Sequence, residues 1–282
     1  MKPPAPGRAA WRACALLTTL LLVACGKPAE APAAGPDAGT TAAAKVVVVG
    51  TDAAYAPFES QNEKGEIVGF SVDLMNAVAR KAGLTVKFVN TPWEGIFNAL
   101  TQGDRDVLIS SITITDERKQ TMDFSDPYFD AQQLIAVRAD SPVKAFADLA
   151  KLKVGVQTGT TGDDVVTKLL GKNSTSVRRF ESTPLALKEL DAGGVDAVVA
   201  DNGVVINYVK NNGAGKLRMV SDATFKPEQY GMAVRKGNAA LLARLNQGLA
   251  AVRADGTYAK IYDKYFGADA GDPGFAASAA RK

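Results

Sequence analysis

The sequence lacks histidine and is nearly free of cysteine. None of its 282 residues is histidine, so the side chain that most often serves as a general base or a transition-metal ligand is missing. Carboxylate chemistry stays open. The two cysteines, Cys14 and Cys25, lie near the N-terminus, and residues 26–282 therefore contain no disulfide. Stability must come from a hydrophobic core, which a chain of this length can bury.

The sequence also lacks a basic tract outside its N-terminus. The formal net charge is +3, and Lys2, Arg8 and Arg12 account for all of it. Without these three, the 33 basic residues fall to 30, which equals the 30 acidic residues. A body without excess charge argues against nucleic acid as a partner.

The first 24 residues are predicted to be a lipoprotein signal peptide. An apolar run over 13–23 follows the cations and is shorter than the ~20 residues that a membrane-spanning helix needs. It ends in Leu22-Val23-Ala24-Cys25, which resembles the lipobox of bacterial lipoproteins, where the chain is cut before a cysteine that carries diacylglycerol. An ordinary secretory signal is the alternative. We expect Cys25 to be lipidated, and residues 25–44, rich in Ala, Pro and Gly, to form a flexible linker.

Short apolar segments alternate with helical patterns over residues 45–267. The predicted strands are 46–50, 85–89, 106–110, 153–157 and 196–200, and the predicted helices are 71–82, 93–102, 160–170 and 184–192. Alternation of this kind predicts α/β layering with mostly parallel strands. The remaining residues, 268–282, are predicted to be a disordered tail.

An internal repeat predicts two related lobes. Residues 100–111 and 190–201 both read L-x-x-G-x-x-D, then apolar residues, then a polar residue, and all the matched positions are 90 residues apart. Each predicts a helix that ends at a glycine, a turn aspartate, a buried parallel strand and a polar residue at its carboxyl end. A general likeness between α/β units explains the shared helix and strand, but it explains the matched Gly and Asp less easily. Because ligands bind outside the carboxyl ends of such strands, Ser111 and Asp201 are expected to face each other across a cleft.

Six segments carry a resemblance to a known family, in order and at matching spacing. They are VGTDAAYAPFE (49–59), GFSVDLMNAVARKAG (69–83), ISSITITDERKQTMDFSDPY (109–128), VGVQTGTTG (154–162), GVDAVVADN (194–202) and DGTYAKIYDKYFG (255–267). They resemble the family 3 bacterial extracellular solute-binding proteins, the polar amino-acid receptors of ABC importers, and most of all the arginine, lysine and histidine receptors. The resemblance implies a periplasmic-binding-protein-like clamshell of type II, in which each lobe is a mostly parallel sheet flanked by helices. Lobe 1 would comprise 45–131 and 230–267, and lobe 2 would comprise 132–229.

The most specific segment contains a candidate carboxylate clamp. Arg118 follows a strand end and sits in the first turn of a predicted helix. From the residues alone, a surface arginine paired with an adjacent carboxylate is an equal reading. The resemblance assigns Arg118 to the α-carboxylate of an amino acid, which a guanidinium binds with two charge-assisted hydrogen bonds. Ser110, Ser111 and Thr113 would otherwise simply fit an exposed strand edge. The resemblance makes them donors and acceptors for the carboxylate and the ammonium.

Three residues of the second predicted lobe complete the backbone-binding end. Thr160 and Thr161 open a predicted helix after a glycine-bearing turn, where free amides and the positive helix end suit an anion. Helix capping is compatible with that role. Asp201 is either the N-cap of the next helix or, as the resemblance implies, the partner of the α-ammonium.

Three further residues are expected at the side-chain end of the ligand. Aromatic rings such as those of Tyr55 and Trp93 can sandwich an aliphatic or guanidinium stem, and Asp52 can pair with a cationic tip. The alternatives are that Trp93 belongs to the core and that Asp52 stabilises its own turn.

The resemblance implies a receptor without catalytic activity. It would capture a free polar amino acid, with arginine, lysine or histidine favoured and glutamine the alternative, and deliver it to the permease of an ABC importer and through it to the ATPase. We expect a monomer without a cofactor, held in the periplasm or at the cell surface by the lipid on Cys25. A dehydratase-like enzyme on the same fold is less favoured without histidine, and a membrane-bound sensor domain is less favoured without a spanning segment.

Overall fold

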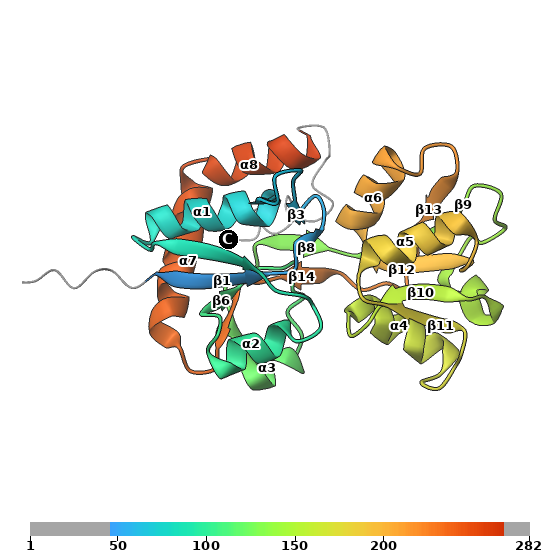
Figure 1. Ribbon diagram of the computed structural model, residues 1–282, viewed down its shortest axis with the longest axis horizontal. Coiled ribbons are helices and arrows are strands. Elements are labelled where there is room, and N and C mark those ends of the chain that lie inside the picture. Colours follow the sequence, from blue (N-terminus) through green and yellow to red (C-terminus); the bar gives the residue numbers. More distant parts are fainter. Residues whose placement is uncertain (1–45, 268–282) are drawn as a thin grey trace, which may run out of the picture. The chain divides into compact units, whose positions relative to one another are not determined.

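Two lobes, each built around one five-stranded sheet, make up the computed structural model, which describes residues 46–267 (Figure 1). In lobe 1 the strand order is β5-β1-β6-β15-β7, and in lobe 2 it is β11-β10-β12-β9-β13. The lobe 1 strands are β1 (Val47–Thr51), β5 (Val86–Asn90), β6 (Val107–Leu108), β7 (Met122–Phe124) and β15 (Ala233–Arg235). The lobe 2 strands are β9 (Gln133–Arg138), β10 (Val154–Gln157), β11 (Val177–Phe180), β12 (Ala197–Asp201) and β13 (Leu217–Val220). The predicted two-lobe α/β fold is confirmed.

Four of the five strands in each sheet run in the same direction. The first three strands of each order are paired parallel, the fourth is antiparallel to both its neighbours, and the fifth therefore runs with the first three. In lobe 2 the fourth strand, β9, follows β8 (Phe129–Ala131) almost directly. Its first residue, Gln133, pairs with Asp201, the last residue of β12, so β9 enters the sheet at the carboxyl end of the parallel strands.

The chain passes between the lobes along a two-stranded sheet. Strand β8 carries the chain from lobe 1 to lobe 2, and β14 (Glu228–Tyr230) carries it back, paired antiparallel to β8.

The helices cover both sheets and bury their apolar faces against them (Figure 1). On lobe 1 they are α1 (Phe70–Lys81), α2 (Ile96–Gln102), α3 (Arg118–Thr121), α7 (Ala239–Ala254) and α8 (Thr257–Phe266). On lobe 2 they are α4 (Thr161–Leu170), α5 (Thr183–Ala192), α6 (Asn202–Asn211) and the 3-10 helix η1 (Phe146–Lys151). A small sheet of β2 (Ala54–Tyr55), β3 (Glu59–Gln61) and β4 (Ile67–Val68) completes lobe 1. Each lobe has its own hydrophobic core.

The internal repeat has the same local structure in both lobes. The glycines that end α2 and α5, Gly103 and Gly193, have left-handed φ angles of 92° and 82°. Such angles favour glycine at the end of a helix. Both turn aspartates accept a backbone hydrogen bond from the start of the neighbouring strand: Asp106 Oδ2 from the Val48 amide (3.0 Å) and Asp196 Oδ2 from the Lys153 amide (2.8 Å).

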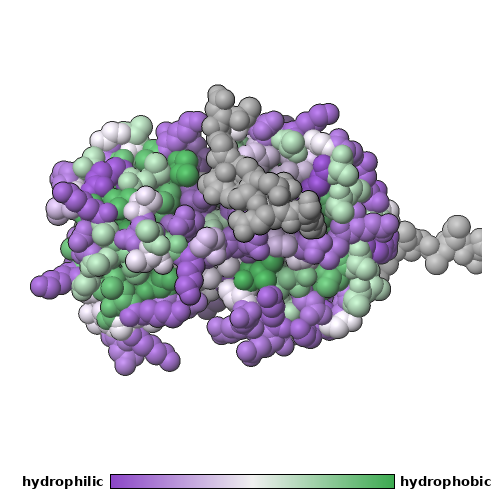
Figure 2. Space-filling view, turned by 180° about the vertical axis from the view of Figure 1, so that it is seen from behind, coloured by the Kyte–Doolittle hydropathy of each residue, from purple (hydrophilic) through white to green (hydrophobic). Residues whose placement is uncertain are grey.

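Hydrophilic residues cover most of the face that Figure 2 shows, and hydrophobic residues appear in patches between them. None of the helices within residues 46–267 has the length and apolar character needed to cross a membrane. The predicted signal peptide, Cys25, the linker and the tail after 267 lie outside the described residues.

Candidate functional site

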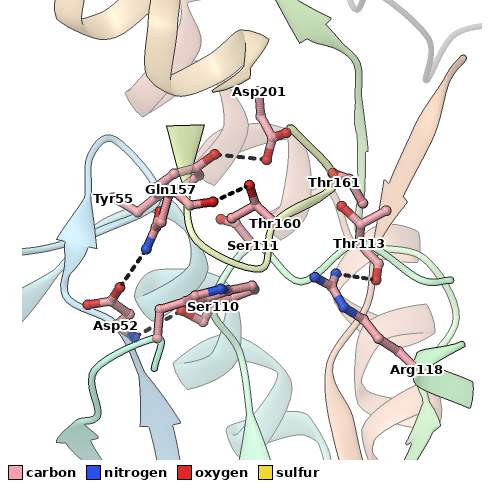
Figure 3. Close-up of a pocket in the computed structure, with 11 residues that line it drawn as sticks. Asp52, Tyr55, Ser110, Ser111, Thr113, Arg118, Gln157, Thr160, Thr161 and Asp201 are labelled. Atoms are coloured by element: carbon pink, nitrogen blue, oxygen red, sulfur yellow. Dashed lines mark hydrogen bonds between the residues drawn. The ribbon is translucent and has the colours of Figure 1, made fainter. Parts of the chain in front are cut away.

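Polar side chains from both lobes line one pocket (Figure 3). All ten residues that the sequence predicted for the site line this pocket, and Gln157 joins them. The predicted ten are Asp52, Tyr55, Trp93, Ser110, Ser111, Thr113, Arg118, Thr160, Thr161 and Asp201. Ser111 and Asp201, which the repeat placed on opposite sides of a cleft, both line it.

The pocket lies at the carboxyl ends of strands from both sheets. Asp52 comes directly after β1, Ser110 follows β6, Thr160 follows β10, and Asp201 is the last residue of β12. Parallel strands bring their carboxyl ends to one edge of a sheet, and this edge is where ligands bind in open α/β sheets.

The guanidinium of Arg118 is held by neutral partners. Its Nη1 donates to the backbone oxygen of Thr113 at 2.9 Å, and Nη2 donates to that of Gly159 at 3.3 Å. The cation also lies over the rings of Trp93 and Phe97, 5.4 and 5.2 Å from their centroids. Burial lowers the pKa of Arg118 from its usual value, yet a guanidinium stays protonated in proteins. None of its described contacts is an ion pair with an adjacent carboxylate, so its remaining N–H groups can serve an anion in the pocket.

Asp201 is a buried carboxylate whose oxygens face the pocket. Its Oδ2 accepts from the hydroxyls of Tyr55 (2.8 Å) and Tyr230, and its Oδ1 accepts from Gln133 Nε2. Burial, and secondly the charge of Glu228, raise the pKa of Asp201 to about 6. Asp201 does precede α6, but its side chain makes no capping bond to that helix. The N-cap alternative is thus not realised by the carboxylate.

Three hydroxyl groups of the pocket already donate to carboxylates. Ser111 Oγ donates to Glu59 Oε1, and the Oγ1 atoms of Thr113 and Thr161 both donate to Glu228 Oε2, each at 2.8 Å. A hydroxyl has one hydrogen and two lone pairs. In this arrangement these three oxygens can only accept hydrogen bonds from a ligand. The sequence had predicted that these side chains would both donate and accept.

Hydrogen bonds join the two serines to neighbouring segments of lobe 1. Ser110 Oγ accepts from the Asp52 amide at 2.9 Å, and the Ser111 amide donates to the hydroxyl of Tyr128 at 3.2 Å. Ser111 has a φ of 50°, in the left-handed region that residues other than glycine seldom occupy. Backbone strain of this kind concentrates at functional sites.

The start of α4 offers backbone amides to the pocket. Thr160 is its N-cap, and Thr160 Oγ1 accepts from the Asp163 amide at 3.2 Å, as the sequence predicted. Thr161 and Gly162 then begin the helix, where amides have no partner within the helix and suit an anion. A side chain on Gly162 would meet the Val199 oxygen at 2.9 Å, so glycine lets α4 lie close to β12.

Asp52 and Arg118 stand at opposite ends of the pocket (Figure 3). Gln157 Nε2 approaches Asp52 Oδ2 at 3.4 Å, and the Gln157 side-chain oxygen accepts from Thr183 Oγ1 at 3.0 Å. Burial raises the pKa of Asp52. The partners described for this carboxylate are uncharged, so its end of the pocket suits a cation.

Sequence reasoning missed Gln157, Gln133 and Glu228. Gln157 is a buried polar residue at the carboxyl end of β10, which is the same signal that identified Ser111 and Asp201. Gln133 and Glu228 lie on the strands that connect the lobes, and nothing in their local sequence indicates a site. Among residues 46–267, no group of three or more acidic side chains is placed to hold a metal ion.

Comparison with known proteins gives a consistent result. Residues 47–268 match the model of the bacterial extracellular solute-binding proteins, family 3. A probable histidine-binding protein of Neisseria gonorrhoeae is 48% identical over 93% of this chain and 97% of the relative. An L-arginine-binding protein of Pseudomonas aeruginosa is 36% identical over 82% of this chain and 91% of the relative.

A solved structure shares the fold at high sequence identity. It is that of ArtJ, the arginine-, lysine-, histidine-binding protein of Geobacillus stearothermophilus. ArtJ is 49% identical, and the match has a TM-score of 0.76 and covers 79% of this chain and 96% of ArtJ. These relatives are binding proteins by name, which agrees with the expectation that the chain is a receptor and not an enzyme.

Proposed function

This chain belongs to the family 3 bacterial extracellular solute-binding proteins, and from that membership we propose that it is the receptor of an ABC importer for a basic amino acid. The observation that carries the proposal is that Arg118 and Asp52 lie at opposite ends of one pocket that Asp201 also lines. A free amino acid presents a carboxylate and an ammonium together, and a basic side chain adds a second cation.

The backbone of the ligand would bind between Arg118, α4 and Asp201. Arg118 and the first amides of α4 supply positive charge for the α-carboxylate. Asp201 and the oxygens of Ser111 and Thr113 supply acceptors for the α-ammonium. The hydroxyl hydrogens that already donate to carboxylates support the accepting role.

The side chain of the ligand would extend toward Asp52. The rings of Tyr55 and Trp93 border its path, and Asp52 would exchange its long contact with Gln157 for a charge-assisted bond. A neutral glutamine would leave Asp52 as a buried charge without a counter-charge, which weakens binding. Arginine, lysine and histidine are therefore the proposed ligands, and glutamine is the weaker alternative.

The experiment that tests this assignment compares three ligands on two proteins. Calorimetry of the unaltered protein should show tighter binding of arginine and lysine than of glutamine. The Asp52→Asn variant should lose far more affinity for arginine and lysine than for glutamine, so the preference narrows or reverses. Equal losses of affinity for all three ligands would mean that Asp52 affects the shape of the pocket but not its preference for a positively charged ligand. Glutamine as the sole ligand of the unaltered protein would overturn the assignment.

We further propose the domain plan on which delivery depends. Residues 1–24 are a signal peptide, Cys25 carries the lipid, 25–44 are a linker, and the monomeric body is held at the outer side of a membrane. Ligand would shift the body, with lobe 1 at 45–131 and 230–267 and lobe 2 at 132–229, toward a closed state. The permease would then recognise the two lobes together.

A further inference from the structure

Glu228 makes hydrogen bonds to both lobes at once. It begins β14, the strand on which the chain returns to lobe 1. Its Oε2 accepts from Thr113 Oγ1, which belongs to lobe 1, and from Thr161 Oγ1, which begins α4 in lobe 2, each at 2.8 Å. Its Oε1 accepts from Gln133 Nε2 at 3.2 Å. We call the two bonds from Oε2 the Glu228 clasp.

The clasp lies between the ligand pocket and a second, neighbouring cleft. Thr113 and Thr161 line the ligand pocket, and both also line a neighbouring cleft that is open to solvent. Glu228 and Gln133 line the neighbouring cleft and not the ligand pocket. The two threonines and the carboxylate that joins them therefore form the wall between the pocket and the cleft.

We propose that Glu228 is a positioning residue whose clasp joins Thr113 to Thr161 across the lobes, keeps the ligand pocket closed toward the neighbouring cleft, and thereby sets how fast a bound amino acid leaves. The inference rests on the proposed function, since it concerns release of the ligand proposed there. Glu228 acts through the two threonines and does not itself line the ligand pocket.

A carboxylate is the side chain that this position requires. Three donors converge on it, namely two hydroxyls on one oxygen and the amide nitrogen of Gln133 on the other. A carboxylate accepts on both oxygens, whereas an amide of the same shape accepts on one and donates from the other. Glutamine at position 228 must therefore either turn its NH2 group toward the amide nitrogen of Gln133 or donate to the two threonine hydroxyls, whose hydrogens then need other acceptors. In both cases the present set of three bonds is not kept.

The test measures ligand exchange rates in the Glu228→Gln variant. Trp93 lines the pocket, so stopped-flow tryptophan fluorescence can follow arginine binding to the purified protein. We expect the dissociation rate constant to rise about tenfold or more while the association rate constant stays within threefold, because most changes of affinity within one site lie in dissociation. A dissociation rate within twofold of that of the unaltered protein overturns the proposal.

Glu117→Gln provides the matched control. Glu117 lines the same neighbouring cleft and undergoes the same loss of charge, but it takes no part in the clasp. Its exchange rates should equal those of the unaltered protein. Equal acceleration by both variants would assign the effect to the charge of the cleft and would refute the clasp.

A double-mutant cycle separates the clasp from a general weakening of the fold. Thr161→Val removes the lobe 2 hydroxyl, so Glu228→Gln in that background should accelerate release by less than threefold. A full tenfold acceleration in both backgrounds contradicts the proposal. If Glu228→Gln does not fold, Thr161→Val must speed release, because it removes the lobe 2 hydroxyl of the clasp, and an unchanged rate overturns the proposal. An unaltered protein that binds no amino acid would instead disprove the proposed function itself.

Discussion

Arg118 is bound by two carbonyl oxygens that come from different lobes. Thr113 lies between β6 and α3 in lobe 1, and Gly159 belongs to the turn before α4 in lobe 2. Both hydrogen-bond partners are neutral, and the carboxylates that act on the buried guanidinium do so without a described ion pair. A residue in this state stabilises an anion strongly, because the anion replaces lost hydration without displacing another counter-ion.

We predict that Arg118→Ala abolishes binding of every amino acid alike, since Arg118 faces the carboxylate that they all share. Loss of a desolvated charge partner costs about 3–5 kcal/mol, which exceeds a hundredfold in affinity. Calorimetry with arginine, lysine, histidine and glutamine measures the loss. Lys119→Ala, which removes the neighbouring exposed cation, should leave affinity unchanged. Binding by Arg118→Ala within tenfold of the unaltered protein would exclude Arg118 from the site.

Asp201 predicts a pH dependence of binding. The pKa of its carboxyl is raised to about 6, first by burial and then by Glu228, and Tyr55, Tyr230 and Gln133 also face it. Only the ionised form pairs with an ammonium, and pairing lowers this pKa in the complex. The affinity for arginine should therefore be constant above about pH 7. It should decrease as the pH falls through 6, by up to about tenfold for each pH unit.

Calorimetry in buffers of different ionisation heat checks this linkage. At pH 6, binding of arginine should release a fraction of a proton, whereas at pH 8 it should release none. Arginine is the suitable probe because its own side chain does not titrate in this range. A dissociation constant that stays the same from pH 8 to pH 5 would show that Asp201 does not receive the ammonium.

The sequence itself predicted Ser111 and Asp201, because a polar residue at the end of a buried strand is conspicuous and the repeat matches the two. The role of Arg118 was predicted from the family resemblance, since its local sequence fits a surface arginine equally well. Glu228 could not be predicted, because its partners Thr113 and Thr161 are 115 and 67 residues away in the sequence. Which distant side chains converge on a carboxylate follows from the packing of the lobes and not from a local pattern.

At the scale of elements, the order of helices and strands could be predicted and their ends less well. The strand expected at 106–110 extends only over Val107–Leu108, because the backbone turns into a left-handed conformation at Ser111. The direction of the fourth strand in each sheet also could not be predicted, since it depends on how the chain re-enters each lobe. Helix ends marked by glycine, such as Gly103 and Gly193, were the most predictable boundaries.

The repeated turn aspartates predict unequal effects on stability. Asp106 is buried and lies 3.7 Å from Arg235 in addition to its bond to the Val48 amide, whereas the bond of Asp196 to the Lys153 amide is exposed. Asp106→Ala should lower the free energy of unfolding by about 1.5–3 kcal/mol, the usual range for a hydrogen bond to a charged group. Asp196→Ala should lower it by less. Urea unfolding curves measure both, and equal losses would contradict this explanation.

At the scale of the whole molecule, the proposed anchor predicts where the protein is found. Cys25→Ser removes the thiol that the proposed lipidation uses, and the other cysteine, Cys14, lies within the proposed signal peptide. The variant should move from the membrane fraction to the soluble fraction after cells are broken and centrifuged, while the affinity of the body for arginine stays the same. If Cys25→Ser still sediments with membranes, the protein is held there by something other than this lipid.

Strand β15 lies between β6 and β7 in the sheet of lobe 1, although it comes more than a hundred residues later in the sequence. All five strands of the lobe 2 sheet, by contrast, fall within residues 133–220. Synthesis runs from the N-terminus, so the lobe 1 sheet stays without an inner strand until residue 235 has been added. Lobe 2 can complete its sheet earlier. The proposed signal peptide implies that the chain is exported unfolded. Because lobe 1 needs β15 to complete its sheet, the N-terminal part of the chain cannot finish folding until most of the chain has been made.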